Sequence, residues 1–220
     1  MKVLFIGNSY TAFHSLPQAV ATLAAAAEAN ISADMAIAGG KDLEWHWEEG
    51  EGRAKIAARA PGLVVLQDHS LGALRAREKM FDYARRFDAE IRAHGAETVL
   101  FMTWARQFAP ETQTRITEAY AAIARELGAR LAPVGAAWQK SLAARPHVVL
   151  HMEDGSHPTQ HGSYLAACVL VATLLGEGFD FRPLPAAVEA QSQALMRLDE
   201  EGAAFLQKIA WETVKEARQT

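Results

Sequence analysis

Near its start the chain reads VLFIGNSYT (residues 3–11), in which four apolar residues run directly into small and polar ones. A short run that is apolar throughout is typical of a strand buried on both faces, as in a parallel sheet covered by helices on each side. The glycine that ends the run, Gly7, permits a sharp turn of the backbone, and the residues after it suit the start of a helix. The stretch therefore predicts a first strand that turns sharply into a helix, with Ser9 at the turn.

The same alternation of apolar runs and helical patterns continues along the chain. Four further strands are expected at residues 33–38, 63–66, 98–103 and 130–134. Helices are expected around them at residues 16–29, 45–56, 73–94, 111–127 and 162–175, with one or two more in residues 186–216. Strands that are apolar on both faces and separated by helices indicate a parallel sheet. The expected fold is therefore α/β: a three-layer α/β/α sandwich with a five-stranded parallel sheet, formed by residues 1–220 as a single domain.

The composition is that of a globular protein whose charge is nearly balanced. Of the 220 residues, 22 are Lys or Arg and 26 are Asp or Glu, which gives a formal net charge of −4. This balance argues against nucleic acid or an anionic membrane as the main partner. The first apolar run is too short for a signal peptide, and the longest later run, residues 165–175, is too short to span a bilayer. We therefore expect a cytoplasmic protein whose single cysteine, Cys168, is buried in that later run.

Ser9 is matched near the other end of the chain by a second short motif, Asp154-Gly155-Ser156-His157-Pro158. In a doubly wound sheet, functional groups gather beyond the carboxyl ends of the strands, so both motifs are expected at one edge. Hydrolysis by a serine needs a base that takes its proton and a carboxylate that orients the base. Alone, either motif also fits an ordinary turn. Together they predict Ser9 as nucleophile, His157 as base and Asp154 as the residue that orients the base.

These residues resemble the blocks that identify the SGNH hydrolases, also called GDSL-type esterases and lipases. Residues 3–9 are similar to the first block, with Asn8 where aspartate is commoner, and residues 154–158 match the D-x-x-H-P of the last block. Gly40, after the second expected strand, is similar to the glycine of the second block. The resemblance implies the flavodoxin-like fold of this family and the same three catalytic residues. It also implies that the backbone N–H of Gly40 helps to bind the oxyanion.

The third block departs from the family pattern. The family has Gly-x-Asn-Asp, whose asparagine donates to the oxyanion, whereas this chain has Gln67-Asp68-His69-Ser70. His69 occupies the asparagine position, and Gln67 is an alternative amide donor. The chain is similar to a branch of the family that begins with Gly-Asn-Ser-Tyr-Thr and has Leu-Gln in its third block. The loss of one oxyanion donor lowers the catalytic rate by about 10²–10³. We therefore expect the departure to affect the rate of catalysis more than the class of reaction.

The resemblance implies a serine esterase that hydrolyses short-chain acyl esters, acetyl esters on carbohydrates among them. The expected partner is accordingly a small-molecule or glycan ester, and no cofactor is expected. Trp104, after the fourth expected strand, and Trp45 or Trp47, after Gly40, lie where an aromatic ring could stack on a sugar. Packing in the core is the alternative for each of these side chains.

The residues also leave other interpretations open. A flavodoxin-like sheet can bind the phosphate of flavin mononucleotide at the loop after its first strand, and residues 7–11 are suitably small and hydroxyl-rich. A degenerate hydrolase could instead bind carbohydrate without cleaving it. His151, His157 and His161 with nearby carboxylates could hold a metal, but their spacing matches no zinc template, so no metal site is expected.

Overall fold

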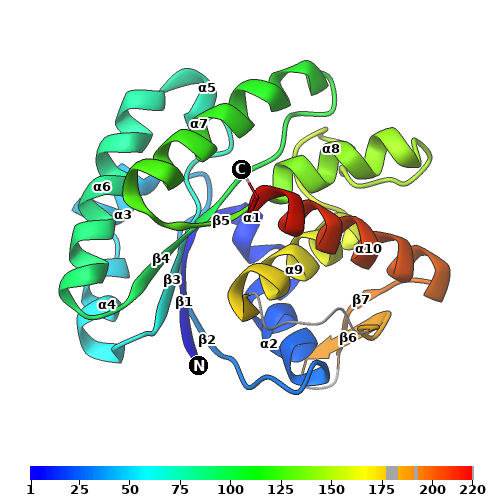
Figure 1. The fold of residues 1–220 in the computed structure, drawn as a ribbon, viewed down its shortest axis with the longest axis horizontal. Helices are drawn as coiled ribbons and strands as arrows, with labels where there is room; N and C mark the ends of the chain where they lie inside the picture. Colours follow the sequence, from blue (N-terminus) through cyan, green and yellow to red (C-terminus); the bar gives the residue numbers. More distant parts are fainter. Residues whose placement is uncertain (177–182, 191–192, 220) are drawn as a thin grey trace.

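The computed structural model describes residues 1–176, 183–190 and 193–219, and its centre is a parallel sheet of five strands (Figure 1). The strands are β1 (Lys2–Gly7), β2 (Ser32–Ile37), β3 (Leu63–Leu66), β4 (Glu97–Phe101) and β5 (Arg130–Ala132). Their order is β2-β1-β3-β4-β5, so the chain starts inside the sheet and extends it on both sides. The five predicted strands are confirmed, with small differences at their ends.

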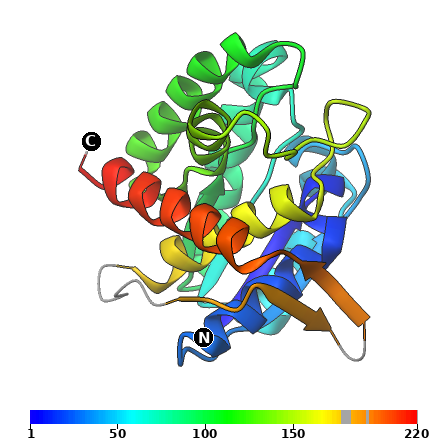
Figure 2. The same ribbon diagram turned by 90° about the vertical axis from the view of Figure 1, so that its right-hand side faces the viewer.

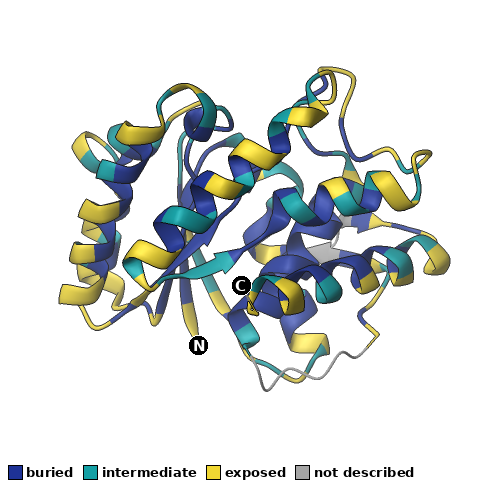
Figure 3. Ribbon diagram, turned by 45° about the horizontal axis from the view of Figure 1, so that its top comes forward, coloured by how far each residue is buried: buried dark blue, intermediate teal, exposed yellow. Residues whose placement is uncertain are grey.

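The sheet divides the core into two halves because the side chains of each strand alternate between its faces. In β1, Val3 and Phe5 pack into one buried cluster, whereas Leu4 and Ile6 pack into another. The helices that cover the first face are α2 (Leu16–Ala26), α8 (Val134–Ala144), α9 (Gln160–Leu175) and α10 (Glu200–Ala217). Those that cover the second are α3 (Leu43–Glu48), α4 (Gly52–Arg59), α5 (Gly72–Arg75), α6 (Arg77–Ala93) and α7 (Gln113–Leu127). Figure 3 shows that the helices turn their buried sides inward, as the predicted three-layer sandwich requires.

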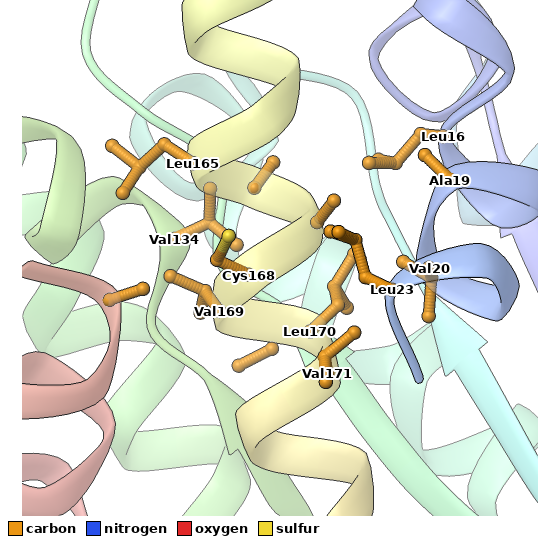
Figure 4. Close-up of a cluster of buried hydrophobic side chains, with 14 of the residues drawn as sticks. Leu16, Ala19, Val20, Leu23, Val134, Leu165, Cys168, Val169, Leu170 and Val171 are labelled. Carbon is orange, nitrogen blue, oxygen red and sulfur yellow. The ribbon is translucent and has the colours of Figure 1, made fainter. Parts of the chain in front are cut away.

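The helix α9 is buried from Gly162 to Leu174, which explains why its sequence is apolar on every side. It contacts α2 and α10 as well as β5, so no face is left to solvent over most of its length. Figure 4 shows two of its side chains, Leu170 and Val171, beside Val20 and Leu23 of α2. Cys168 lies inside this cluster at 3% exposure, and burial raises the pKa of its thiol. The thiol is therefore a packing group.

The prediction of helices throughout residues 186–216 is wrong for the first part of that segment. A hairpin precedes α10 (Figure 2). In this hairpin, β6 (Ala187–Ala190) pairs antiparallel with β7 (Gln193–Arg197). Val188 and Met196 are partners in this hairpin and are both fully buried. Each strand is too short for its alternation to stand out in the sequence. The helix α8, after β5, is a further element that the sequence pattern did not predict.

Two short 3-10 helices, η1 (Phe13–Ser15) and η2 (Pro110–Thr112), complete the connections, together with the one-turn helix α1 (Ser9–Ala12) after β1. Among the residues that the structure describes, no helix has both the length and the apolar character needed to cross a membrane.

Candidate active site

The turn after β1 presents Ser9 at the carboxyl edge of the sheet. Gly7 ends the strand where a side chain has no room, since a Cβ there would lie 2.7 Å from Oε1 of Gln67. Asn8 begins α1 as its N-cap, and its side-chain oxygen accepts a hydrogen bond from the N–H of Tyr10 at 3.1 Å. Ser9 is therefore the first residue of α1, where it is half-buried.

A row of hydrogen bonds joins the three residues that the sequence motifs singled out. The Ser9 Oγ lies 2.9 Å from Nε2 of His157, and Nδ1 of His157 lies 2.5 Å from Oδ2 of Asp154. The hydrogen bond with His157 is the main cause that lowers the pKa of Asp154 to about 2. The carboxylate is therefore ionised near neutral pH, which favours a proton on Nδ1 and leaves Nε2 free to accept from Ser9.

The loop that carries Asp154 and His157 is held by its own backbone and by the loop after β4. Oδ1 of Asp154 accepts hydrogen bonds from the N–H groups of Ser156 and His157, both at 2.9 Å. The carbonyl of Gly155 accepts from the N–H of Gln107 at 2.9 Å. Gly155 has a φ of +65°, a left-handed conformation that glycine adopts without strain. The position of the carboxylate is therefore determined before a substrate arrives.

Trp104 is part of the core, and its predicted contact with substrate is wrong. Its ring is 1% exposed and lies between Tyr10 and Trp138, with centroids 4.2 and 4.0 Å away and nearly parallel planes. Its Nε1 donates to the carbonyl of Ser156 at 2.9 Å. Trp104 thus contacts both motifs: it stacks on Tyr10, which follows Ser9, and it donates to Ser156, which precedes His157. Packing, the alternative for this residue, is what the structure contains.

Trp45 and Trp47, the other tryptophans considered for stacking on a sugar, lie on α3 and are both half-buried. Trp47 meets Phe87 of α6 edge to face at 5.2 Å between centroids, so its ring belongs to the packing of α3 on α6. Trp45 lies under the Nζ of Lys41, which is 5.6 Å from the ring centroid.

Gln67 cannot serve as an oxyanion donor, which corrects one of the two expectations for the third block. The side chain is fully buried, and its Oε1 accepts from the N–H of Asn8 and from the hydroxyl of Thr11, both at 2.9 Å. Its Nε2 donates to the carbonyl of Asp68. Both ends of the amide are thus occupied inside the protein. Gln67 holds the turn that carries Ser9, but its N–H groups do not face a substrate.

His69 meets the requirements of a donor better. It is half-buried, and its Nδ1 accepts a hydrogen bond from the N–H of Leu71 at 3.2 Å. Burial lowers the pKa of its ring, and the positive charge of Arg106 lowers it further, so the neutral form is favoured. With Nδ1 acting as an acceptor, the proton of the neutral ring is on Nε2. His69 therefore carries a single, defined N–H donor.

The loops after the first three strands are tied together behind the site. Nδ2 of Asn8 donates to the carbonyl of Lys41 at 2.8 Å and to that of Asp68 at 3.4 Å. Oδ1 of Asp68 accepts from the N–H of Leu43 at 2.9 Å, and burial raises the pKa of this carboxyl to about 6. The sequence predicts Asn8 as a turn residue and as a variant of the first block, but in the structure it also links three loops. No local pattern in the sequence reveals such a role.

Gly40 lies in a tight turn directly after β2. The turn is closed by a hydrogen bond from the N–H of Lys41 to the carbonyl of Ala38 at 3.2 Å, and Gly40 has a φ of +69°. Gly40 is exposed, and no protein partner of its N–H is found in the part of the chain that the structure describes. The group is therefore open to a ligand.

Two residues beside the site were not predicted. The ring of Phe13 stacks on the imidazole of His157, with 4.7 Å between centroids. The next two residues, His14 and Ser15, have left-handed backbones with φ of +51° and +48°, which side-chain-bearing residues rarely adopt.

The other residue that the sequence did not predict is Arg106, which follows β4. Its Nη2 donates to Oγ of Ser70 at 2.8 Å.

The histidines considered as a metal cluster do not converge. The ring of His151 is buried, and its Nε2 is 3.0 Å from the carbonyl of Ala105, to which it can donate. Across residues 1–176, 183–190 and 193–219, no three His, Cys, Asp or Glu side chains are grouped to hold a metal ion.

Comparison with solved structures finds this fold in known proteins. A candidate SGNH hydrolase from Slackia heliotrinireducens is 27% identical to this chain, with a TM-score of 0.66, over 79% of this chain and 98% of its own. A DUF4886 family protein from Bacteroides uniformis is 18% identical, with a TM-score of 0.77, over 98% of this chain and 95% of its own. A variant of an acetyl xylan esterase from Geobacillus stearothermophilus is 16% identical, with a TM-score of 0.57, over 82% and 96%. No protein-family model matches the sequence, and no curated protein matches it either.

Proposed function

Since the chain belongs by its fold to the SGNH hydrolase superfamily, we propose that it is a serine esterase that hydrolyses short-chain acyl esters. The observation that carries the proposal is the row of hydrogen bonds from Ser9 through His157 to Asp154. A capped turn needs no imidazole on its serine, and a flavin-binding loop needs none either. A nucleophile, by contrast, needs this base and this carboxylate.

In the proposed reaction, the Ser9 oxygen attacks the carbonyl carbon of the ester while His157 takes the hydroxyl proton. The same imidazolium then protonates the leaving alkoxide, and Asp154 stabilises the positive charge on the ring between the two steps. A water molecule, deprotonated by His157, releases the acyl group from Ser9. No cofactor takes part in this scheme.

The oxyanion would be bound by the N–H groups of Ser9 and Gly40 and by Nε2 of His69. Two observations support these donors: the N–H of Gly40 is open to a ligand, and the Nδ1 of His69 already accepts a backbone hydrogen bond. Three donors aimed at the developing charge lower the barrier because they need no reorientation during the reaction. His69 then replaces the asparagine of the family pattern.

Acetyl esters on carbohydrates are the substrate class that we favour within this reaction. A neighbour in fold is described as an acetyl xylan esterase. The ring of Phe13 stacks on the imidazole of His157, and on this ground too we favour small acyl groups.

The test is hydrolysis of p-nitrophenyl acetate by the parent protein and by Ser9→Ala and His157→Ala. We expect turnover in the parent and a loss of at least about 10³-fold in kcat/KM in each variant, because the members of a triad act as a unit. His147→Ala, at an exposed histidine, is the matched control and should retain full activity. A fluorophosphonate probe should also add its mass to the Ser9 peptide of the parent. Equal rates in parent and variants would exclude Ser9 as nucleophile.

A further inference from the structure

Arg106 is a cation without a carboxylate partner beside the site. It follows β4 and is half-buried, and the only hydrogen bond of its side chain among the described residues goes to the neutral hydroxyl of Ser70, at 2.8 Å. Within that part of the chain no carboxylate lies within ion-pair distance of its guanidinium, whereas Arg85 and Arg92 on α6 both bind carboxylates. A guanidinium has five N–H donors, so most of its capacity to bind an oxyanion is unused.

The guanidinium is joined to the loop after β3 by its hydrogen bond to Ser70, the residue that follows His69. Its charge lowers the pKa of His69, and it counteracts part of the rise that burial causes in the pKa of Tyr10. Tyr10 follows Ser9 in the chain, and His69 precedes Ser70, to which Arg106 is bonded. The next residue, Gln107, is tied by its N–H to the carbonyl of Gly155. Arg106 is therefore held in place by the loops that carry the site.

Arg106 also lines a cavity of about 300 Å³ whose other walls are largely apolar. The apolar lining comes from Ala105, Pro110, Trp138, Leu142 and Ala143. A cavity of this size accepts a short aliphatic chain or a single ring. The rest of the lining is polar and comes from Gln107, Gln113, Gln139 and His151, so the cavity offers hydrogen-bonding groups beside the guanidinium.

We propose that Arg106 binds an anionic group of the ester substrate, so that the enzyme prefers esters that carry a negative charge to neutral esters of the same shape. This inference rests on the proposed esterase function and adds to it the charge of the substrate. A planar guanidinium binds a carboxylate through two parallel hydrogen bonds, and partial burial strengthens the attraction because water screens it less. A neutral group of the same shape cannot replace the anion without loss of this interaction.

The experiment compares anionic esters with neutral esters of similar shape. Mono-p-nitrophenyl adipate against p-nitrophenyl hexanoate places the charge on the acyl side, and p-acetoxybenzoate against its methyl ester places it on the alcohol side. In the parent we expect a lower KM for the anionic member of at least one pair. Arg106→Gln should raise that KM by at least about tenfold, as expected for the loss of a hydrogen bond to a charged group, with the neutral esters little affected.

Arg106→Lys keeps the charge without the planar fork and should retain part of the preference. Arg115→Gln on α7 makes the same change of charge at an exposed arginine and should leave the preference intact. Inhibition of neutral-ester hydrolysis by p-hydroxybenzoate, compared with p-hydroxybenzamide, tests the parent without any variant.

The outcomes separate the two proposals. Equal KM values within both pairs, with no selective effect of Arg106→Gln, would overturn the role of Arg106 and leave the esterase intact. A failure to hydrolyse any of these esters would overturn the proposed function, and this inference with it.

Discussion

The hydroxyl oxygen of Ser9 lies 2.9 Å from Nε2 of His157, across a separation of 148 positions in the sequence. The two residues are held by different parts of the fold. Ser9 is held by the turn after β1, in which Gln67 and Asn8 take part, whereas His157 is held by a loop that is bonded to the loop after β4. Their relative position therefore depends on the packing of the whole carboxyl edge of the sheet.

His69→Ala should lower kcat for p-nitrophenyl acetate by about 10²-fold and change KM little, because an oxyanion donor acts mainly in the transition state. Steady-state kinetics measure both parameters. His69→Asn restores an N–H donor of the family type and should recover part of the rate. An unchanged kcat in a folded His69→Ala protein would remove this residue from the oxyanion site.

Asp154→Asn should destabilise the protein in a pH-dependent way. The pKa of Asp154 is lowered from 3.8 to about 2, so its ionised form is the one that stabilises the folded state. That stabilisation is fully present above the unfolded-state pKa and is lost as the pH falls toward the folded-state value. The difference in unfolding free energy between parent and variant should therefore shrink between about pH 5 and pH 2.

Urea unfolding at several pH values measures this difference. Glu153→Gln changes the neighbouring exposed carboxylate and should show no such trend. A difference that stays constant over the whole range would mean that the Asp154 carboxylate is not stabilised in the folded state.

Gln67→Ala should lower the free energy of unfolding by about 2–3 kcal/mol, because it leaves the N–H of Asn8 and the hydroxyl of Thr11 buried without their acceptor. Activity should fall as well, since both groups belong to the turn that carries Ser9. Denaturant unfolding and kinetics check the two effects. Gln18→Ala, on the exposed side of α2, is the control. A variant as stable as the parent would contradict the structural role of Gln67.

Trp104→Ala should cost about 3–5 kcal/mol of stability, since it removes a fully buried ring between two others. Trp104→Phe should cost less and should leave KM unchanged for p-nitrophenyl acetate and for acetylated sugars, because the ring does not reach the substrate. Thermal unfolding and KM are the measurements. A higher KM in a stable Trp104→Phe protein would show that this side chain contacts the substrate after all.

The sequence by itself determined the secondary structure of the sheet and the two short motifs of the site. Strands such as residues 63–66 can be predicted from the sequence because a strand that is buried on both faces has no polar positions. The pairing of Asp154 with His157 can also be predicted, because the two residues lie three positions apart and their contact is local. The hairpin of β6 and β7 was missed because each strand is only a few residues long.

Only the tertiary structure decided between side chains of similar chemistry at the edge of the sheet. Gln67 and His69 are both possible donors by their chemistry. The Gln67 amide is enclosed by Asn8 and Thr11, whereas the Nε2–H of His69 has no partner among the residues that the structure describes. Trp104 follows a strand in the position of a rim residue, but Tyr10 and Trp138 enclose it. Whether such a group faces solvent or core depends on partners far away in the chain, because packing and hydrogen bonding join residues that the sequence keeps apart.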